Sequence, residues 1–175
     1  GGGGFAMIGH GGISSNGAKG DADDVIHVEA TGDITLQGGV GGNTFVRHPG
    51  GRRNTTGNYL TKRIEVVSQN GDLTMIGGSN AGDDDAYVQI GHGSGQNTST
   101  ADSEILVDVR NGTVTVTAGA GNAGGTPTAN FAQIGHGGHE NQGAQSGQII
   151  VLADAITLNG GTRDESYAQI GHGGF

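Results

Sequence analysis

The sequence contains no cysteine, no tryptophan and only two prolines, and aromatic residues make up 4% of its 175 positions. Without cysteine the chain has neither a disulfide framework nor a thiolate metal site. No apolar run approaches the roughly 20 residues that a membrane-spanning helix needs. Basic residues are also scarce, eight against 17 acidic ones, and the net charge of −9 argues against nucleic acid as a partner.

Glycine, by contrast, is abundant, with 39 residues. These glycines follow no period of three, which excludes a collagen-like triple helix. A glycine-rich chain in which hydrophobic residues make up only 32% is compatible with disorder. The β-branched residues, however, recur in regular clusters along the chain, and this regularity favours an ordered β-structure.

One phrase returns along the chain. It reads FAMIGHGG at 5–12, YVQIGHGS at 87–94, FAQIGHGG at 131–138 and YAQIGHGG at 167–174, with a degenerate copy, FVRHPGG, at 45–51. Such recurrence identifies a repeat architecture. Both ends of the chain lie within this phrase, so we expect a segment of a longer array. We treat 1–175 as one array, made of a truncated repeat at 1–12 and four repeats at 13–51, 52–95, 96–138 and 139–175.

Three strand-like segments recur in fixed order in each repeat. The first has the pattern Ile-x-Val-x-small and starts at Ile26, Ile64, Ile105 and Ile149. The second is centred on threonines spaced 39, 41 and 42 residues apart, namely Thr35, Thr74, Thr115 and Thr157. The third is the phrase itself, whose Ala or Val and Ile we expect to face inward and whose aromatic residue and Gln we expect to face outward. This period of two is that of a β-strand.

These segments predict an all-β parallel β-solenoid without substantial helix. We expect about four rungs of three short strands, with roughly 40 residues per repeat and rungs about 4.8 Å apart. An alternative geometry places two rungs of about 20 residues in each repeat. An antiparallel sandwich or barrel fits less well, because it does not require equivalent positions to return in register.

The segment Ile-x-Val-x-Ala followed by Gly-Asp-Ile-Thr-Leu-x-Gly-Gly, at 26–39 and more loosely at 64–78 and 149–161, resembles the coil repeats of filamentous haemagglutinin-type proteins. Those are large bacterial exoproteins and adhesins exported by two-partner secretion. The phrase Ala-Gln-Ile-Gly-His-Gly-Gly is similar to a repeat of very large surface proteins of this kind. The resemblance covers nearly the whole chain. It implies a β-helix, an extracellular or cell-surface location and a role as stalk or adhesin. The secretion domain of that family is absent from the sequence.

Histidine recurs in the phrase at His10, His92, His136 and His172, with His48 in the degenerate copy. Stacked rungs would align these side chains in a column about 5 Å apart. Such a column suits a divalent metal or an acid-sensitive site. Alternatively, each ring stacks on the next and hydrogen-bonds to backbone at the Gly-rich corner. We favour this structural role with neutral rings, because no carboxylate recurs beside them and like charges at this spacing repel.

Five of the seven aromatic residues share a place in the phrase: Phe5, Phe45, Tyr87, Phe131 and Tyr167. Counting by two from the inward residues places them outside the core. An exposed aromatic stripe would suit glycan stacking or side-by-side packing of fibres. The alternative, which we favour, is a ladder of rings covered by a neighbouring loop.

Two charged clusters lie in the loops. The acidic run Asp83, Asp84 and Asp85 is a candidate for calcium, although the tandem nonapeptide of calcium-binding β-rolls is missing and a solvated loop is the simpler interpretation. A basic cluster holds five of the eight basic residues: Arg47, Arg52, Arg53, Lys62 and Arg63. It is a candidate docking patch for an acidic partner, or else another solvated loop.

No nucleophile–base arrangement, phosphate loop or pair of carboxylates on a shared strand is present, so we expect no enzymatic activity and, calcium aside, no cofactor. We predict a structural or adhesive segment of a secreted or surface-attached bacterial fibre, which forms a stiff rod. Its expected partners are further repeats or copies of the same chain and cell-surface glycans. The alternatives are a carbohydrate-binding or carbohydrate-cleaving β-helix and a filament subunit that stacks end to end.

Overall fold

The computed structural model describes residues 6–8, 23–39, 44–46, 62–78, 86–93, 100–120, 130–138, 141–162 and 165–174. All regular structure in these ranges is β-strand, and every strand pairing found there is parallel. The all-β prediction is therefore confirmed, and no helix occurs in the described part of the chain. Accordingly, none of the described residues forms a helix that is long and apolar enough to cross a membrane.

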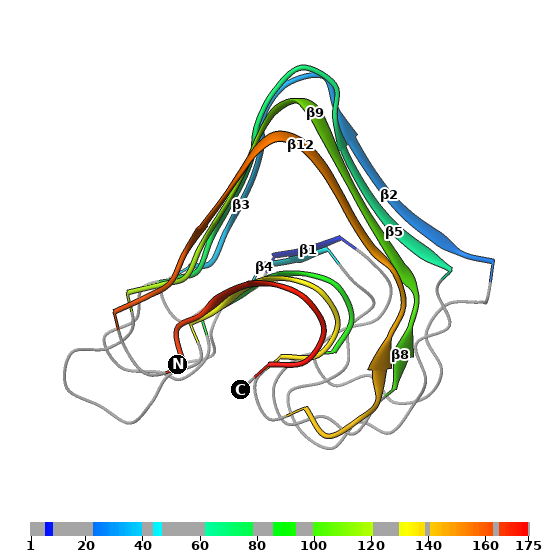
Figure 1. Ribbon diagram of the computed structural model, residues 1–175, viewed down its shortest axis with the longest axis vertical. Helices are drawn as coiled ribbons and strands as arrows, with labels where there is room; N and C mark the ends of the chain where they lie inside the picture. Colours follow the sequence, from blue (N-terminus) through cyan, green and yellow to red (C-terminus); the bar gives the residue numbers. More distant parts are fainter. Residues whose placement is uncertain are drawn as a thin grey trace.

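The strands lie on three sides of a common interior (Figure 1). The first and second sides meet at an apex and belong to one sheet, made of β2 (Val25–Ala30), β3 (Ile34–Gln37), β5 (Arg63–Ser68), β6 (Leu73–Ile76), β9 (Glu104–Thr117) and β12 (Ile149–Asn159). The third side is a five-stranded sheet of β1 (Ala6–Ile8), β4 (Thr44–Val46), β7 (Val88–Ile90), β10 (Ala132–Ile134) and β13 (Ala168–Ile170). A small separate sheet pairs β8 (Ala101–Asp102) with β11 (Gln145–Ser146).

Equivalent residues of successive repeats pair directly. On the first side Ile64 pairs with Ile26 and with Ile105, and Ile105 pairs with Ile149. The threonines of the second side pair in the same way, in the order Thr35, Thr74, Thr115 and Thr157. Each repeat thus contributes one strand to each side, which excludes two levels per repeat. We call each level a layer: β2–β4 form layer 1, β5–β7 layer 2, β8–β10 layer 3 and β11–β13 layer 4.

The apex differs from the prediction in layers 3 and 4. We expected two strands separated by a tight turn, but β9 and β12 each continue around the apex as one bent strand. At the apex a side chain links two layers, because the Thr113 amide donates to Oδ1 of Asp72 in the layer before, at 2.8 Å. The apex of β12 is two residues shorter, so its register with β9 shifts between Ala153 and Ala155.

The core is a continuous aliphatic column. Its members are the inward residues of all three sides, and those of the middle layers, such as Ile64, Leu73 and Ile134, are fully buried. In layer 4 the equivalent residues Ile156 and Leu158 are each 47% exposed. Burial of each layer therefore depends on the neighbouring layers, as expected where adjacent repeats supply the core to one another.

Candidate functional site

The recurring phrase forms a corner at the ends of β7, β10 and β13. In layer 3, Ala132 and Ile134 face the aliphatic core, and the chain then turns through Gly135, His136 and Gly137. The second glycine of each Gly-His-Gly turn has a positive φ: 82° at Gly93, 100° at Gly137 and 85° at Gly173. This region of backbone conformation favours glycine, which explains the glycine at this position in layers 2 to 4.

The glutamine of the phrase is buried rather than solvent-facing, which corrects the outward orientation that we expected. Gln89 and Gln133 are both fully buried. The Gln89 amide donates to the carbonyls of Gly135 at 3.0 Å and Gly137 at 2.8 Å, in the next layer. Gln133 repeats this pattern one layer on, at 2.9 Å and 2.7 Å. The side chain points away from the core but donates to the turn of the following layer, so it links layers and is not a surface group.

The histidines form the predicted stack. The rings of His92 and His136 lie 5.0 Å apart with an angle of 3°, and those of His136 and His172 lie 4.9 Å apart with an angle of 9°. The His92 backbone amide donates to Nδ1 of His136 at 2.9 Å, and the His136 amide donates to Nδ1 of His172 at 3.2 Å. The rings of His136 and His172 are therefore each bonded to the layer before. We call His92, His136 and His172 the histidine column.

The other ring nitrogen also has a partner. Nε2 of His136 lies 2.9 Å from the Ser103 carbonyl oxygen, and Nε2 of His172 lies 2.8 Å from the Gly147 carbonyl oxygen. A carbonyl only accepts and a backbone amide only donates, so these contacts assign the neutral imidazole with hydrogen on Nε2. Burial lowers the pKa of His136 to about 4, against the opposing effects of the Ser103 carbonyl and of Asp102.

This bonding is incompatible with the metal hypothesis at His136 and His172, because neither ring has a nitrogen lone pair left for a cation. In the ranges that the structure describes, no group of three or more His, Asp or Glu side chains is placed to hold a metal ion. His10, His48 and the acidic run Asp83, Asp84 and Asp85 lie outside those ranges.

The aromatic residues also stack, and they are not a surface stripe. Tyr87 and Phe131 are buried, with ring centroids 4.4 Å apart, and Phe131 and Tyr167 lie 5.0 Å apart with parallel planes. We call these three residues the ring column. It forms a cluster of its own, apart from the aliphatic core. The exposed interaction face is therefore wrong for Tyr87 and Phe131. Phe5 and the side chain of Phe45 lie outside the described part.

Phe45 does not share the backbone position of this column. It pairs with Gln89, two residues after Tyr87, and the same strand pairs Val46 with Ile90. In the degenerate copy the interval from the aromatic residue to histidine is three residues instead of five, so aligning it by its aromatic residue gave the wrong register. Counting back from histidine gives the right one, because His48 follows Phe45 by three residues, as His92 follows Gln89.

The outward face of the first side carries a charged network that sequence analysis treated as scattered residues. His27 lies 2.9 Å from a carboxylate oxygen of Glu65 and 3.3 Å from one of Glu29. Arg63 donates to Glu104 at 3.0 Å and lies 3.9 Å from Glu65. These groups meet because parallel register brings residues about 40 positions apart side by side. The hydrogen bonds from Glu65 and then Glu29 raise the pKa of His27.

The predicted basic patch is only partly visible. Lys62 is exposed, whereas Arg63 is paired with acidic residues of its own sheet. Arg47, Arg52 and Arg53 lie outside the described ranges. Arg63 therefore has its charge compensated within the sheet, and Lys62 is the one residue of this group that the structure describes as a solvent-facing cation.

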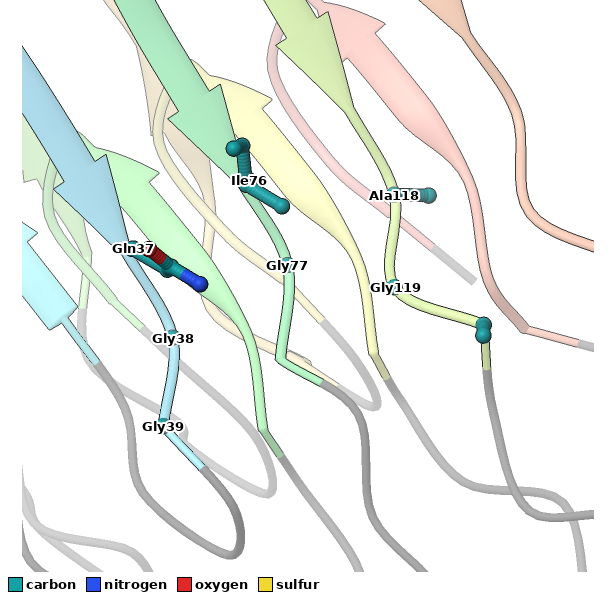
Figure 2. A pocket seen from close by; sticks show the side chains of 8 residues that line it. Gln37, Gly38, Gly39, Ile76, Gly77, Ala118 and Gly119 are labelled. Carbon is teal, nitrogen blue, oxygen red and sulfur yellow. The ribbon is translucent and has the colours of Figure 1, made fainter.

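An open groove of about 510 Å³ follows the end of the second side, where layers 1 to 3 lie next to one another (Figure 2). It is lined by Gln37, Gly38, Gly39, Ile76, Gly77, Ala118, Gly119 and Ala120. The lining has neither a charged nor an aromatic side chain. A Cβ at Gly38 would lie 2.6 Å from the Gly78 amide nitrogen, and one at Gly77 would overlap the Gly119 amide. These glycines serve the close approach of successive layers, and the lining offers no group for catalysis.

Comparisons with known proteins give no family assignment: no protein-family model matches the chain, and searches among curated proteins and among solved structures found no match.

Proposed function

We propose that the chain is a stretch of parallel β-solenoid that serves as a stiff structural rod in a secreted or surface-attached bacterial fibre. The solenoid is supported by in-register pairing on all three sides, with one strand per side from each repeat. The bacterial and extracellular assignment is supported by the resemblance of 26–39 to filamentous haemagglutinin-type coils.

The observation that carries the rod function is the use of the recurring polar groups. The side-chain NH2 groups of Gln89 and Gln133 and the ring of His136 are bonded to backbone atoms of neighbouring layers, and none of the three side chains is exposed. A recurring binding site would present such groups to solvent. Here they join one layer to the next, which is what a load-bearing rod requires.

The carbohydrate-binding alternative needs an exposed aromatic face. Tyr87 and Phe131 are buried in the ring column and do not offer one. The carboxylates Glu65 and Glu104 on the outer face are paired with His27 and Arg63. We therefore favour a non-enzymatic rod.

We propose that the neighbours of the layers described here are further repeats of the same chain or other copies of it. In the described part of the chain β13 ends its sheet and β12 pairs only with β9, so a further layer can pair with both.

Paired cysteine substitutions test the architecture, since the chain has no cysteine of its own. Thr74 and Thr115 pair in register, at the roughly 4.8 Å spacing of neighbouring parallel strands, which a disulfide can span. Thr74→Cys with Thr115→Cys should form a disulfide on mild oxidation. Thr35→Cys with Thr115→Cys, two layers and about 10 Å apart, should stay reduced. Equal oxidation of both pairs would contradict the layered architecture.

Single-molecule pulling tests the rod. Layers that unfold one at a time should give length increments of roughly 140 Å, for about 40 residues at about 3.5 Å each. A single low-force transition of the whole chain would contradict a mechanical role.

Titration against a panel of glycans tests the carbohydrate-binding alternative. Tight binding of one defined oligosaccharide would favour a carbohydrate-binding module over a rod.

A further inference from the structure

In layers 3 and 4 the histidine column joins the end of the layer to its beginning. His136 follows the last strand of layer 3, and its Nε2 bonds to Ser103, directly before β9. His172 follows the last strand of layer 4, and its Nε2 bonds to Gly147, shortly before β12. Ser103 and Gly147 are equivalent positions, because the residues before them, Asp102 and Ser146, pair in β8 and β11. The contact is thus repeated in two successive layers, over sequence separations of 33 and 25 residues.

Each ring nitrogen of His136 has a backbone hydrogen-bond partner, one of which is a donor and the other an acceptor. The His92 amide donates to Nδ1, and the Ser103 carbonyl accepts from Nε2. A second proton would reside on Nδ1, where it would face the hydrogen of the His92 amide. Nδ1 of His172 likewise accepts from the His136 amide. The geometry around His136 therefore accommodates only the neutral ring.

We propose that the histidine column is an acid-sensitive closure: the neutral rings hold each corner to the start of its own layer and to the layer before, and protonation releases the corner. The released part comprises the Gly-His-Gly turn and its contact with the β8–β11 sheet. The aliphatic core has no titratable member, so the three-sided stack persists when the corners open.

The charges around His136 support this direction. His172 and His92 stack on its two faces, and the charge of His172 lowers the pKa of His136. Asp102, at the end of β8, opposes this effect. Burial is the largest influence and also disfavours the charged ring. These are the titratable groups that act on His136 from the described elements packed against it.

The sign of the effect follows from linkage. Because the pKa of His136 lies below its ordinary value of 6.5 when the corner is closed, the open form binds the proton more tightly. Closure is therefore most stable above pH 6.5 and weakens as the pH falls from 6.5 toward 4. With a pKa of about 4, the closing equilibrium should fall on the order of 100-fold between pH 7 and pH 4.

Exchange of single amides, followed by NMR on the full chain, measures this closure. The protection factor of the His92 amide should fall on the order of 100-fold between pH 7 and pH 4, while that of core amides such as Val107 should change much less. Imidazole nitrogen shifts should show His136 neutral at pH 7, with hydrogen on Nε2. A protonated ring at pH 7, or a change of less than about threefold in His92 protection, would overturn the proposal.

Two variants separate histidine from carboxylate titration. His136→Gln keeps a donor toward the Ser103 carbonyl but has no acid-base chemistry, so it should lose the pH dependence of His92 protection. Asp102→Asn should keep that dependence. If Asp102→Asn abolishes it, or His136→Gln retains it in full, the carboxylate is responsible and the proposal fails. Should His136→Gln not fold, the wild-type nitrogen shifts alone decide. Neither outcome bears on the rod, which the cysteine pairs and pulling experiments test independently.

Discussion

The His92 backbone amide donates to Nδ1 of His136, and the two imidazoles lie 5.0 Å apart and nearly parallel. Two histidines separated by 44 residues are thus neighbours through both ring and backbone. Gln89 and Gln133 also link layers, because the side-chain amide of each donates to a glycine carbonyl of the following layer. The recurring phrase is therefore a set of contacts between layers, and changes to it should first affect the stability of the stack.

Replacing Gln133 with Leu should destabilise the chain by about 1–3 kcal/mol, because the partly buried carbonyls of Gly171 and Gly173 would lose their donor. Urea unfolding followed by circular dichroism measures the difference. Gln142→Met is the matched control, since Gln142 is exposed and should tolerate the change within about 0.5 kcal/mol. Equal effects of the two substitutions would show that the Gln133 bonds between layers do not contribute.

Replacing Phe131 with Ala should cost about 3–5 kcal/mol, the usual loss for a fully buried aromatic residue. Tyr167→Ala removes a ring from the same column in layer 4, where the side chain is only partly buried, so the loss should be smaller. Thermal and urea unfolding give both values. If Phe131→Ala left stability unchanged and reduced glycan binding or fibre bundling instead, the ring column would be an interaction face after all.

Replacing Gly135 with Ala should destabilise the corner by about 3 kcal/mol, because the added Cβ would overlap the backbone carbonyl of Gly171 in the next layer. Gly171 directly follows β13, and its backbone carbonyl cannot move aside as the end of a side chain can. Gly160→Ala is the control, since a Cβ there meets nothing within 4 Å. An equally small effect at both sites, measured by urea unfolding, would mean that the layers separate easily at this corner.

The sequence was sufficient to predict the paired positions of successive repeats. The threonine series Thr35, Thr74, Thr115 and Thr157 pairs as its spacing indicates, because side-chain period and repeat length together fix the register. The orientation of Gln133 was not predictable in the same way. A period of two separates the core side of a strand from the other side, but it does not tell whether another segment covers that other side.

Contacts between layers escaped prediction for a related reason. His27 and Glu65 are 38 residues apart, and their pairing becomes visible only when the register is known to the residue. Asp33 likewise accepts the Asp72 amide at 2.9 Å, a bond that supports the apex. The Gly-Asp pair at 32–33 and again at 71–72 was a sequence signal from which this bond could have been predicted. Phe45 was misplaced because its copy of the phrase has two residues fewer between the aromatic residue and histidine, so only alignment on His48 gives the register.

The two best-defined histidines should affect stability with opposite dependence on pH. Glu65 and Glu29 raise the pKa of His27 above 6.5 in the folded chain, so its contribution is fully present below pH 6.5 and is lost as the pH rises through the raised value. His136 has the opposite pH dependence. Its pKa in the folded chain lies below 6.5, so its contribution to stability is present above pH 6.5 and is lost as the pH falls. His27 is largely solvent-exposed, so solvent screening makes its effect the smaller of the two.

His27→Gln tests this assignment. The stability difference between the wild-type chain and the variant should be largest near pH 6 and should shrink toward pH 9, as His27 loses its proton beside Glu65. Urea unfolding at a series of pH values gives this difference, and added salt should reduce it because the network lies at the surface. Glu65→Gln, which removes the carboxylate and keeps the size of the side chain, should give the same pH dependence. A difference that grew with pH would mean that the Glu65 and Glu29 hydrogen bonds do not favour the charged ring of His27.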